Sequence, residues 1–381
     1  MNKFICFGCW NNLNDGKGNL NGVMAQLESY IRDTNDTDKT DLIIVSGDNY
    51  YPDKTKIGKE KKHIIYPNKL TEGFQKLPQD IEIDIIMGNH DYETNTTKPK
   101  YFVREREDEE REEGKNCEIT RFEMGAVSTM PNVSLNFFKH RFLSETGTLI
   151  LMIDTSVYSS DVVDYLQCYN IFLENKGLHF ATSEDLINYQ TSLIIETIQQ
   201  YLSNGLNKII MVGHHPITGY KYKEENIKMI DDIPSFLGVL EDIYTTTKDI
   251  PQIKYYYLCA DYHSYQHGYI TLDSGMEIEQ YIAGIGGTEL DPDLPPIEKQ
   301  IELPTGISSY TMERNVQDWG FLVCRPGATE LTCEPIFLQK GGKKRKHTKR
   351  KKISNRKKYK KYTKKHKKNK RLRYYTDQKE K

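Results

Sequence analysis

The 381-residue chain has no apolar run long enough to span a bilayer, which would take about 18 consecutive apolar residues. Its hydrophobic residues, 37% of the total, occur in short stretches. The apolar stretch Phe4–Trp10 is shorter than the apolar region of a signal peptide, and no small-residue cleavage site follows it. The sequence therefore predicts a chain that neither crosses a membrane nor is secreted.

Cysteine is scarce and its seven positions, 6, 9, 117, 168, 259, 324 and 333, are scattered and odd in number. Cys6, Cys259 and Cys324 lie inside apolar runs, where a free thiol behaves as a small hydrophobe. This spacing is not that of a disulfide framework. We therefore expect free thiols and an intracellular, reducing compartment.

The formal net charge of −1 hides a strong segregation of charge along the chain. Residues 341–381 contain 22 Lys and Arg against two acidic residues, a charge of +20. The first 340 residues contain 31 basic and 52 acidic residues, a charge of −21. We expect an acidic domain over residues 1–340 followed by a disordered basic tail over 341–381, because the tail has too few apolar residues to form a core.

Such a tail suits three kinds of partner. Residues 343–373 would bind a polyanion or a nucleic acid without sequence specificity. The same residues would serve as a nuclear localisation signal, or would pair with the acidic domain of their own chain. A Gly-Gly pair before a basic terminus is also similar to tails of proteins from large DNA viruses, which implies a nuclear or virion-associated location.

Short runs of Ile, Val, Leu and Phe predict buried strands at Phe4–Phe7, Leu42–Val45, Ile83–Met87, Leu149–Ile153, Lys208–Val212 and Tyr255–Cys259. Helical periodicity between them predicts helices over Asn19–Asp33 and Ser183–Leu202, the second with a capping box of Thr182 and Asp185. This alternation indicates an α/β sheet.

After residue 268 the helical patterns stop, and strands are predicted at Gly268–Leu272, Ile278–Ala283, Gly320–Cys324 and Leu331–Phe337. We expect these late strands to form a second sheet that closes the domain. The charged inserts Thr94–Gly114 and Asp53–Lys62 are expected to be exposed, the second as a loop.

Metal-capable side chains follow nearly every predicted strand, where ligands of open α/β sheets gather. They are Cys9, Asp48, Tyr51, Asn89, His90, Asp91, His214, His215, Asp261 and His263. Taken singly, each motif has an ordinary alternative. Gly-Asp after a strand is typical of a turn or a helix N-cap, and the histidine pair could close a turn in the core. Together, the convergence of so many oxygen, nitrogen and sulfur donors indicates a dinuclear metal site.

The order of these motifs resembles the calcineurin-like metallophosphoesterase superfamily, and its purple acid phosphatase branch in particular. The motifs are Gly47-Asp48-Asn49-Tyr50-Tyr51, Gly88-Asn89-His90-Asp91, Gly213-His214-His215-Pro216, Asp154-Thr155 and Gly284-Ile285-Gly286-Gly287. The resemblance extends over roughly residues 3 to 337. It implies a four-layer αββα sandwich of two mixed β-sheets flanked by helices.

The resemblance also implies roles for the individual residues. Asp48 would bridge two metal ions, from among iron, zinc and manganese. The first ion would be completed by Cys9, Tyr51 and His263. The second ion would be completed by Asn89, His214 and Asp261. His90 would stabilise the phosphoryl group and protonate the leaving alkoxide, and His215 would bind phosphate oxygens.

Two of these positions depart from the family pattern, which has Asp in place of Cys9 and His in place of Asp261. A Cys thiolate keeps the charge of Asp but is a softer ligand that favours zinc or iron over magnesium. Asp261 adds a negative charge, which weakens the metal as a Lewis acid. Each also has a plain alternative, since Cys9 could simply pack in the core and Asp261 could form an ion pair. Two ions, one ion or a degenerate site are the outcomes this leaves open.

The resulting expectation is a metal-dependent phosphoesterase, similar to acid phosphatases, that hydrolyses phosphate monoesters with a metal-activated water. The alternative is a catalytically impaired protein of the same fold that binds nucleic acid, chromatin or a virion component through its basic tail.

Overall fold

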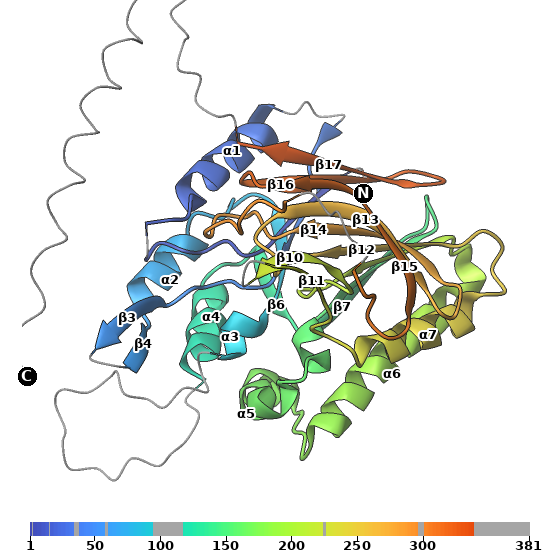
Figure 1. Ribbon diagram of the computed structural model, residues 1–381, viewed down its shortest axis with the longest axis horizontal. Coiled ribbons are helices and arrows are strands. Elements are labelled where there is room, and N and C mark those ends of the chain that lie inside the picture. Colours follow the sequence, from blue (N-terminus) through green and yellow to red (C-terminus); the bar gives the residue numbers. More distant parts are fainter. Residues whose placement is uncertain are drawn as a thin grey trace, which may run out of the picture. The chain divides into compact units, whose positions relative to one another are not determined.

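The computed structural model (Figure 1) describes residues 1, 3–14, 16–33, 38–57, 60–93, 117–223, 226–295 and 301–338. The acidic insert Thr94–Gly114 and the basic segment 343–373 lie outside these residues, so the expectations for both stay predictions. The division at residue 340 between a domain and a tail likewise stays a prediction.

Two large mixed sheets form the centre of the fold. The first has the order β17-β16-β1-β2-β5-β6, in which β1 (Phe4–Phe7), β2 (Leu42–Ser46), β5 (Glu82–Ile86) and β6 (Val133–Asn136) are parallel. On its other side, β16 (Gly320–Pro326) and β17 (Leu331–Phe337) are added antiparallel.

The second sheet has the order β15-β13-β14-β12-β9-β8-β7. Its parallel strands are β8 (Thr148–Ile153), β9 (Lys208–Val212), β12 (Lys254–Cys259) and β14 (Glu277–Ala283). Antiparallel partners are β7 (Phe138–Leu143), β13 (Tyr265–Leu272) and β15 (Ile307–Val316).

Helices cover the outer face of each sheet, which gives the four-layer αββα sandwich (Figure 1). The first sheet packs against α1 (Leu20–Asp33), α2 (Pro67–Phe74) and α4 (Glu118–Ser128). The second sheet packs against α5 (Val162–Leu173), α6 (Ser183–Tyr201) and α7 (Phe236–Thr247). None of the described helices is both long enough and apolar enough to cross a membrane.

Strand β1 shows why the sequence selects this arrangement. Phe4 and Cys6 pack into the core between the two sheets, whereas Ile5 and Phe7 pack toward the helices. Successive side chains of a strand point to opposite faces. A strand covered on both faces therefore needs an unbroken apolar run, and this is the pattern from which six of the parallel strands were predicted. Both predicted helices and the Thr182–Asp185 capping box are also confirmed.

The prediction that the late strands form a sheet of their own is wrong. Strands β13, β14 and β15 extend the second sheet, while β16 and β17 return to the first. Each sheet therefore combines early and late parts of the chain. Apolar patterning shows that a strand is buried but does not identify the strand it pairs with, which explains the error.

The insert Asp53–Lys62 is also not a loop. Its backbone forms an antiparallel ribbon of β3 (Asp53–Ile57) and β4 (Glu60–Ile64). Polar and apolar residues do not alternate here, because five of the ten residues are lysines and only Ile57 has a large apolar side chain. The period-two signal on which strand prediction depends is therefore missing.

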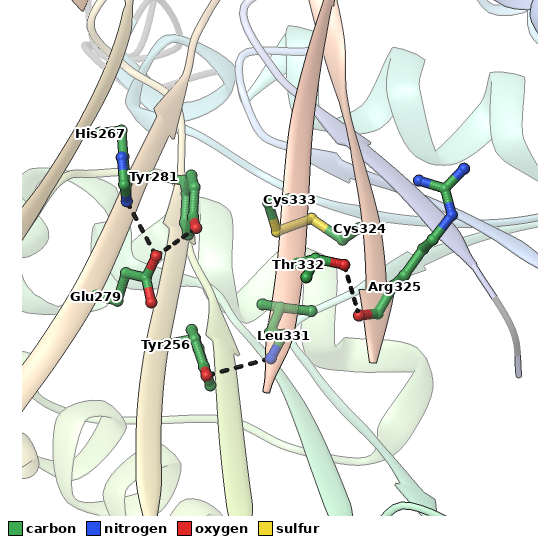
Figure 2. Close-up of a disulfide and its surroundings, with 9 residues drawn as sticks. All are labelled: Tyr256, His267, Glu279, Tyr281, Cys324, Arg325, Leu331, Thr332 and Cys333. Carbon is green, nitrogen blue, oxygen red and sulfur yellow. Dashed lines mark hydrogen bonds and ion pairs between the residues drawn. A yellow bond between two sulfur atoms is a disulfide. The ribbon is translucent and has the colours of Figure 1, made fainter. Parts of the chain in front are cut away.

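Two disulfides contradict the expectation of free thiols throughout. Cys117 at the start of α4 is bonded to Cys168 in α5, with 5.3 Å between their Cα atoms. Cys324 and Cys333 are bonded across the neighbouring strands β16 and β17, as Figure 2 shows. Cys6, Cys9 and Cys259 are free and buried. The sequence argument for a reducing compartment therefore fails, because it depended on unpaired cysteines whose partners only the tertiary fold reveals.

Candidate metal centre

Five parallel strands of the two sheets end near one another, and a metal-capable residue follows each. Cys9, Asp48 and Asn89 come after β1, β2 and β5 of the first sheet. His214 and Asp261 come after β9 and β12 of the second sheet. The distances between their side chains show that the carboxyl ends of both sheets meet at one edge of the sandwich.

His214 lies at the centre of one half of this cluster. Its Nε2 is 3.1 Å from Asn89 Oδ1, 3.2 Å from Asp48 Oδ1 and 3.7 Å from Asp261 Oδ1. Its Nδ1 is 2.7 Å from the backbone oxygen of Ser46, which can only accept, so Nδ1 carries a proton and donates it. If the ring is neutral, Nε2 carries no proton, and its lone pair faces three oxygen atoms. This arrangement requires a positive charge among them.

A proton or a metal cation can supply that charge. Burial lowers the pKa of His214, but the carboxylates of Asp48 and Asp261 outweigh it and raise this pKa to about 9. The same donor set of imidazole, carboxylate and amide oxygen suits zinc, iron or manganese. The residues of this half therefore fit a metal ion.

The Asp48 carboxylate, fully buried, divides the donors into two groups. Its Oδ1 lies next to His214 and accepts a hydrogen bond from the backbone N–H of His90 at 3.1 Å. Its Oδ2 accepts from the Tyr51 hydroxyl at 2.7 Å and lies 3.9 Å from Cys9 Sγ. Burial favours the neutral acid, yet the charges of His214 and His90 hold the pKa of Asp48 well below its usual range. Asp48 is thus an ionised carboxylate with one oxygen toward each group.

The second group consists of Cys9, Tyr51 and His263. The Tyr51 hydroxyl lies 3.2 Å from His263 Nε2 as well as beside Asp48. Burial and the Asp48 charge raise the pKa values of the Cys9 thiol and the Tyr51 hydroxyl well above their usual ranges. Both would ionise only against a nearby cation, because the thiolate rather than the thiol is the metal ligand.

Backbone strain is concentrated at this edge. Cys9, Asp48 and Asp261 have φ angles of 54°, 53° and 53°. This is the left-handed backbone conformation that residues other than glycine rarely adopt. Gly88 is needed for space, since a Cβ there would lie 2.4 Å from Asp48 Oδ1 and 2.7 Å from His214 Nε2. Strain of this kind persists where the surrounding structure enforces it, and it clusters at functional sites.

His215 is oriented by Thr155, which the sequence reasoning noted only as part of a motif. Thr155 Oγ1 accepts the backbone N–H groups of His214 and His215 at 2.9 and 3.0 Å. Its own proton is therefore directed to His215 Nδ1 at 3.2 Å, which leaves the ring proton on Nε2. Burial and the neighbouring His214 lower the pKa of His215 to about 4, so the ring is a neutral donor.

A cavity of about 460 Å³ adjoins the cluster. Its lining includes Asn89, His90, His215, Lys221, Asp232 and Asp261. His90 and His215 are the two residues expected to contact a phosphoryl group. They thus line the same cavity as two of the expected metal ligands, Asn89 and Asp261.

Asp91 is brought to the edge but does not join the donors. Its carboxylate accepts the backbone N–H of Gly88 at 2.8 Å and both the backbone and side-chain N–H of Asn49 at 2.9 Å. It therefore ties the turns after β2 and β5 together. Lys221, on β10 (Gly219–Lys223), is a cavity residue that sequence reasoning missed, because it lies in an alternation of tyrosines and lysines that contains no motif.

Comparison with known proteins gives one family match and several structural likenesses. The calcineurin-like phosphoesterase family matches residues 3–240. Among curated proteins, none matches the chain in sequence.

Solved structures that match include GAP50, the anchor in the inner membrane complex of Plasmodium, at 14% identity and a TM-score of 0.43 over 89% of this chain and 85% of that one. The purple acid phosphatase PPD1 from yellow lupin (Lupinus luteus) matches at 11% identity and a TM-score of 0.44, over 90% of this chain and 52% of that one. PhoD matches at 10% identity and a TM-score of 0.46, over 88% and 68%.

Proposed function

The chain belongs to the calcineurin-like phosphoesterase family, and on that premise we propose that it hydrolyses phosphate monoesters at a dinuclear metal centre. Asp48 would be shared by both ions. Cys9, Tyr51 and His263 would hold the first ion. Asn89, His214 and Asp261 would hold the second. When bound, two such cations neutralise the anionic ester and lower the pKa of a bound water toward neutrality.

The rest of the proposed reaction is carried by the chain's own side chains. His215, neutral with its proton on Nε2, would donate a hydrogen bond to a phosphate oxygen in the cavity. His90 would give a proton to the leaving alkoxide, since it lines the same cavity and its backbone is fixed to Asp48. Thr155 would keep His215 in the required tautomer.

The observation that carries this proposal is the division of donors by Asp48. One carboxylate oxygen lies 3.2 Å from His214 Nε2, which also faces Asn89 and Asp261, and the other lies beside Cys9 and Tyr51. A bridging carboxylate requires this arrangement, whereas an aspartate that only caps a turn would not place its second oxygen among buried donors.

The test is Asp48→Asn, which keeps the shape of the side chain and removes its charge. We expect the variant to lose aryl phosphate hydrolysis by at least about 10³-fold, since charge stabilisation by metal ions supplies several kcal/mol. It should also purify with less bound metal by elemental analysis. Asp80→Asn, at an exposed aspartate remote from the cluster, should match the wild type in both measurements.

Hydrolysis that survives Asp48→Asn would overturn the bridging role. A wild-type chain that purifies without transition metal, takes up none on addition and hydrolyses no phosphate ester would instead support the alternative, a binding protein of this fold.

A further inference from the structure

Asp261 makes the cluster more negative than the family pattern, in which a neutral histidine occupies this position. Its side chain is 3.7 Å from His214 Nε2 and lines the cavity where the phosphate of the proposed function would bind. A carboxylate there attracts metal cations but repels the anionic substrate. If the site works, something nearby should balance this charge.

Lys221 is the residue placed to do so. It lines the same cavity as Asp261, and among the described residues of that lining no other Lys or Arg occurs. Its Nζ lies 4.8 Å from the centre of the Tyr262 ring, the residue next to Asp261. The ammonium group thus lies over the ring of the residue that follows Asp261.

The strand that carries Lys221 is firmly attached to the second sheet. The buried amide of Gln266 accepts the backbone N–H of Tyr220 at 3.2 Å and donates to its carbonyl oxygen at 2.7 Å. Gln280 does the same for the preceding turn, through Ile217 N–H at 2.9 Å and the Thr218 oxygen at 2.6 Å. Two buried glutamines therefore fix the backbone that leads to Lys221. The backbone of an ordinary surface lysine has no such buried side-chain contacts.

The charges around Lys221 are consistent with a permanent cation. Burial alone would lower its pKa, but Asp261, Asp291 and Asp232 raise it above the usual lysine value. The negative charge of Asp261 therefore stabilises the ammonium of Lys221.

We propose that Lys221 is the counter-charge of Asp261, a positioning residue that lets a metal centre with an added carboxylate still accept an anionic phosphate. This inference rests on the proposed function. It predicts opposite changes in two affinities, because removing the ammonium should strengthen metal binding and weaken phosphate binding at once. Damage to the fold would weaken both.

The experiment measures binding on the full chain, without turnover. Titrations give the dissociation constants of Mn²⁺ for the metal-depleted protein and of inorganic phosphate for the metal-loaded protein. For Lys221→Gln we expect phosphate to bind about tenfold more weakly and Mn²⁺ to bind more tightly than in the wild type, the size expected for one nearby charge. Lys221→Arg, which keeps the charge, should stay close to the wild type.

Asp261→His is the second substitution of a double-mutant cycle with Lys221→Gln. Alone, it should weaken Mn²⁺ binding, because the lysine charge is then unbalanced. Combined with Lys221→Gln it should bring both constants back toward the wild type, so the two changes are non-additive. Lys254→Gln is the matched control, since Lys254 begins the same strand β12 that Asp261 follows and pairs with Glu330 at 2.9 Å. It should change neither constant.

Additive effects of the two substitutions, or a Lys221→Gln variant that weakens Mn²⁺ and phosphate together, would overturn the proposal. A wild-type chain that binds none of Mn²⁺, Zn²⁺ and iron would overturn the proposed function as well, and this result is separable because it appears before any substitution is made.

Discussion

Cys9 Sγ lies 3.9 Å from Asp48 Oδ2, the carboxylate oxygen that also accepts from Tyr51, and a ring nitrogen of His214 lies within 4.8 Å of the same sulfur. The thiol is fully buried, and its backbone has the same left-handed conformation as that of Asp48. A cysteine that served only to fill the core would not need this strained backbone. The geometry therefore favours a ligand in the place of the family's aspartate.

Replacing Cys9 tests this. Cys9→Ala should purify with about one equivalent of metal less than the wild type, because the first ion loses an anionic ligand. Cys9→Asp should restore the metal content and shift the preference from zinc toward manganese or magnesium, since carboxylate is the harder ligand. Elemental analysis and hydrolysis assays with each metal give the readout. Unchanged metal content in Cys9→Ala would mean that Cys9 only packs.

Thr155 gives a second prediction. Thr155→Val removes the acceptor of two buried N–H groups and the donor to His215 Nδ1. We expect hydrolysis to fall by at least about tenfold as the tautomer of His215 is lost. We also expect the free energy of unfolding to fall by about 1–3 kcal/mol for each unpaired group.

Thr155→Ser is the control, because it keeps the hydroxyl group with the same three hydrogen bonds. It should retain most of the activity and stability. If both variants lost activity equally, the methyl group of Thr155 rather than its hydrogen bonds would be what matters.

The strands that carry the donors could be predicted from the sequence because each is buried on both faces. Val45 and Ile44, for example, pack into different cores, and this double burial gives the uninterrupted apolar run before Gly47-Asp48. Within each sheet the donors then follow from one rule, that carboxyl ends of parallel strands share an edge; the packing of the two sheets brings the two edges together. That rule does not depend on strand order, which explains how the donors could be predicted together although the sheet assignment of the late strands was wrong.

What could not be predicted depends on contacts between distant segments. A role for Lys221 becomes visible only when the fold places β10 near Asp261. The roles of Gln266 and Gln280 become visible only when they are seen to bind the backbone of that strand and of the turn before it. Likewise the partner of Cys117, 51 residues away, is set by the packing of α4 against α5. None of these pairings leaves a periodic or local signal in the sequence.

The last prediction concerns Asp154, a fully buried carboxyl behind the site. It accepts hydrogen bonds from the hydroxyls of Tyr92 at 2.7 Å and Tyr169 at 3.0 Å and from the backbone N–H of Ser156. These bonds favour its charged form, but burial outweighs them and raises its pKa to about 7. In the unfolded chain the same carboxyl should titrate near 3.8.

Between pH 4 and 7 the folded chain therefore holds a proton at Asp154 that the unfolded chain has lost, so this group makes stability fall as pH rises. The slope is about 1.4 kcal/mol per pH unit. Asp154→Asn cannot lose that proton, so its stability relative to the wild type should increase from pH 4 to pH 7 and then stay constant. Urea unfolding at each pH measures the difference. Asp249→Asn, at an exposed position, should run parallel to the wild type. Parallel curves for Asp154→Asn and wild type would show that Asp154 is already ionised in the folded chain at pH 4, held so by its tyrosine partners.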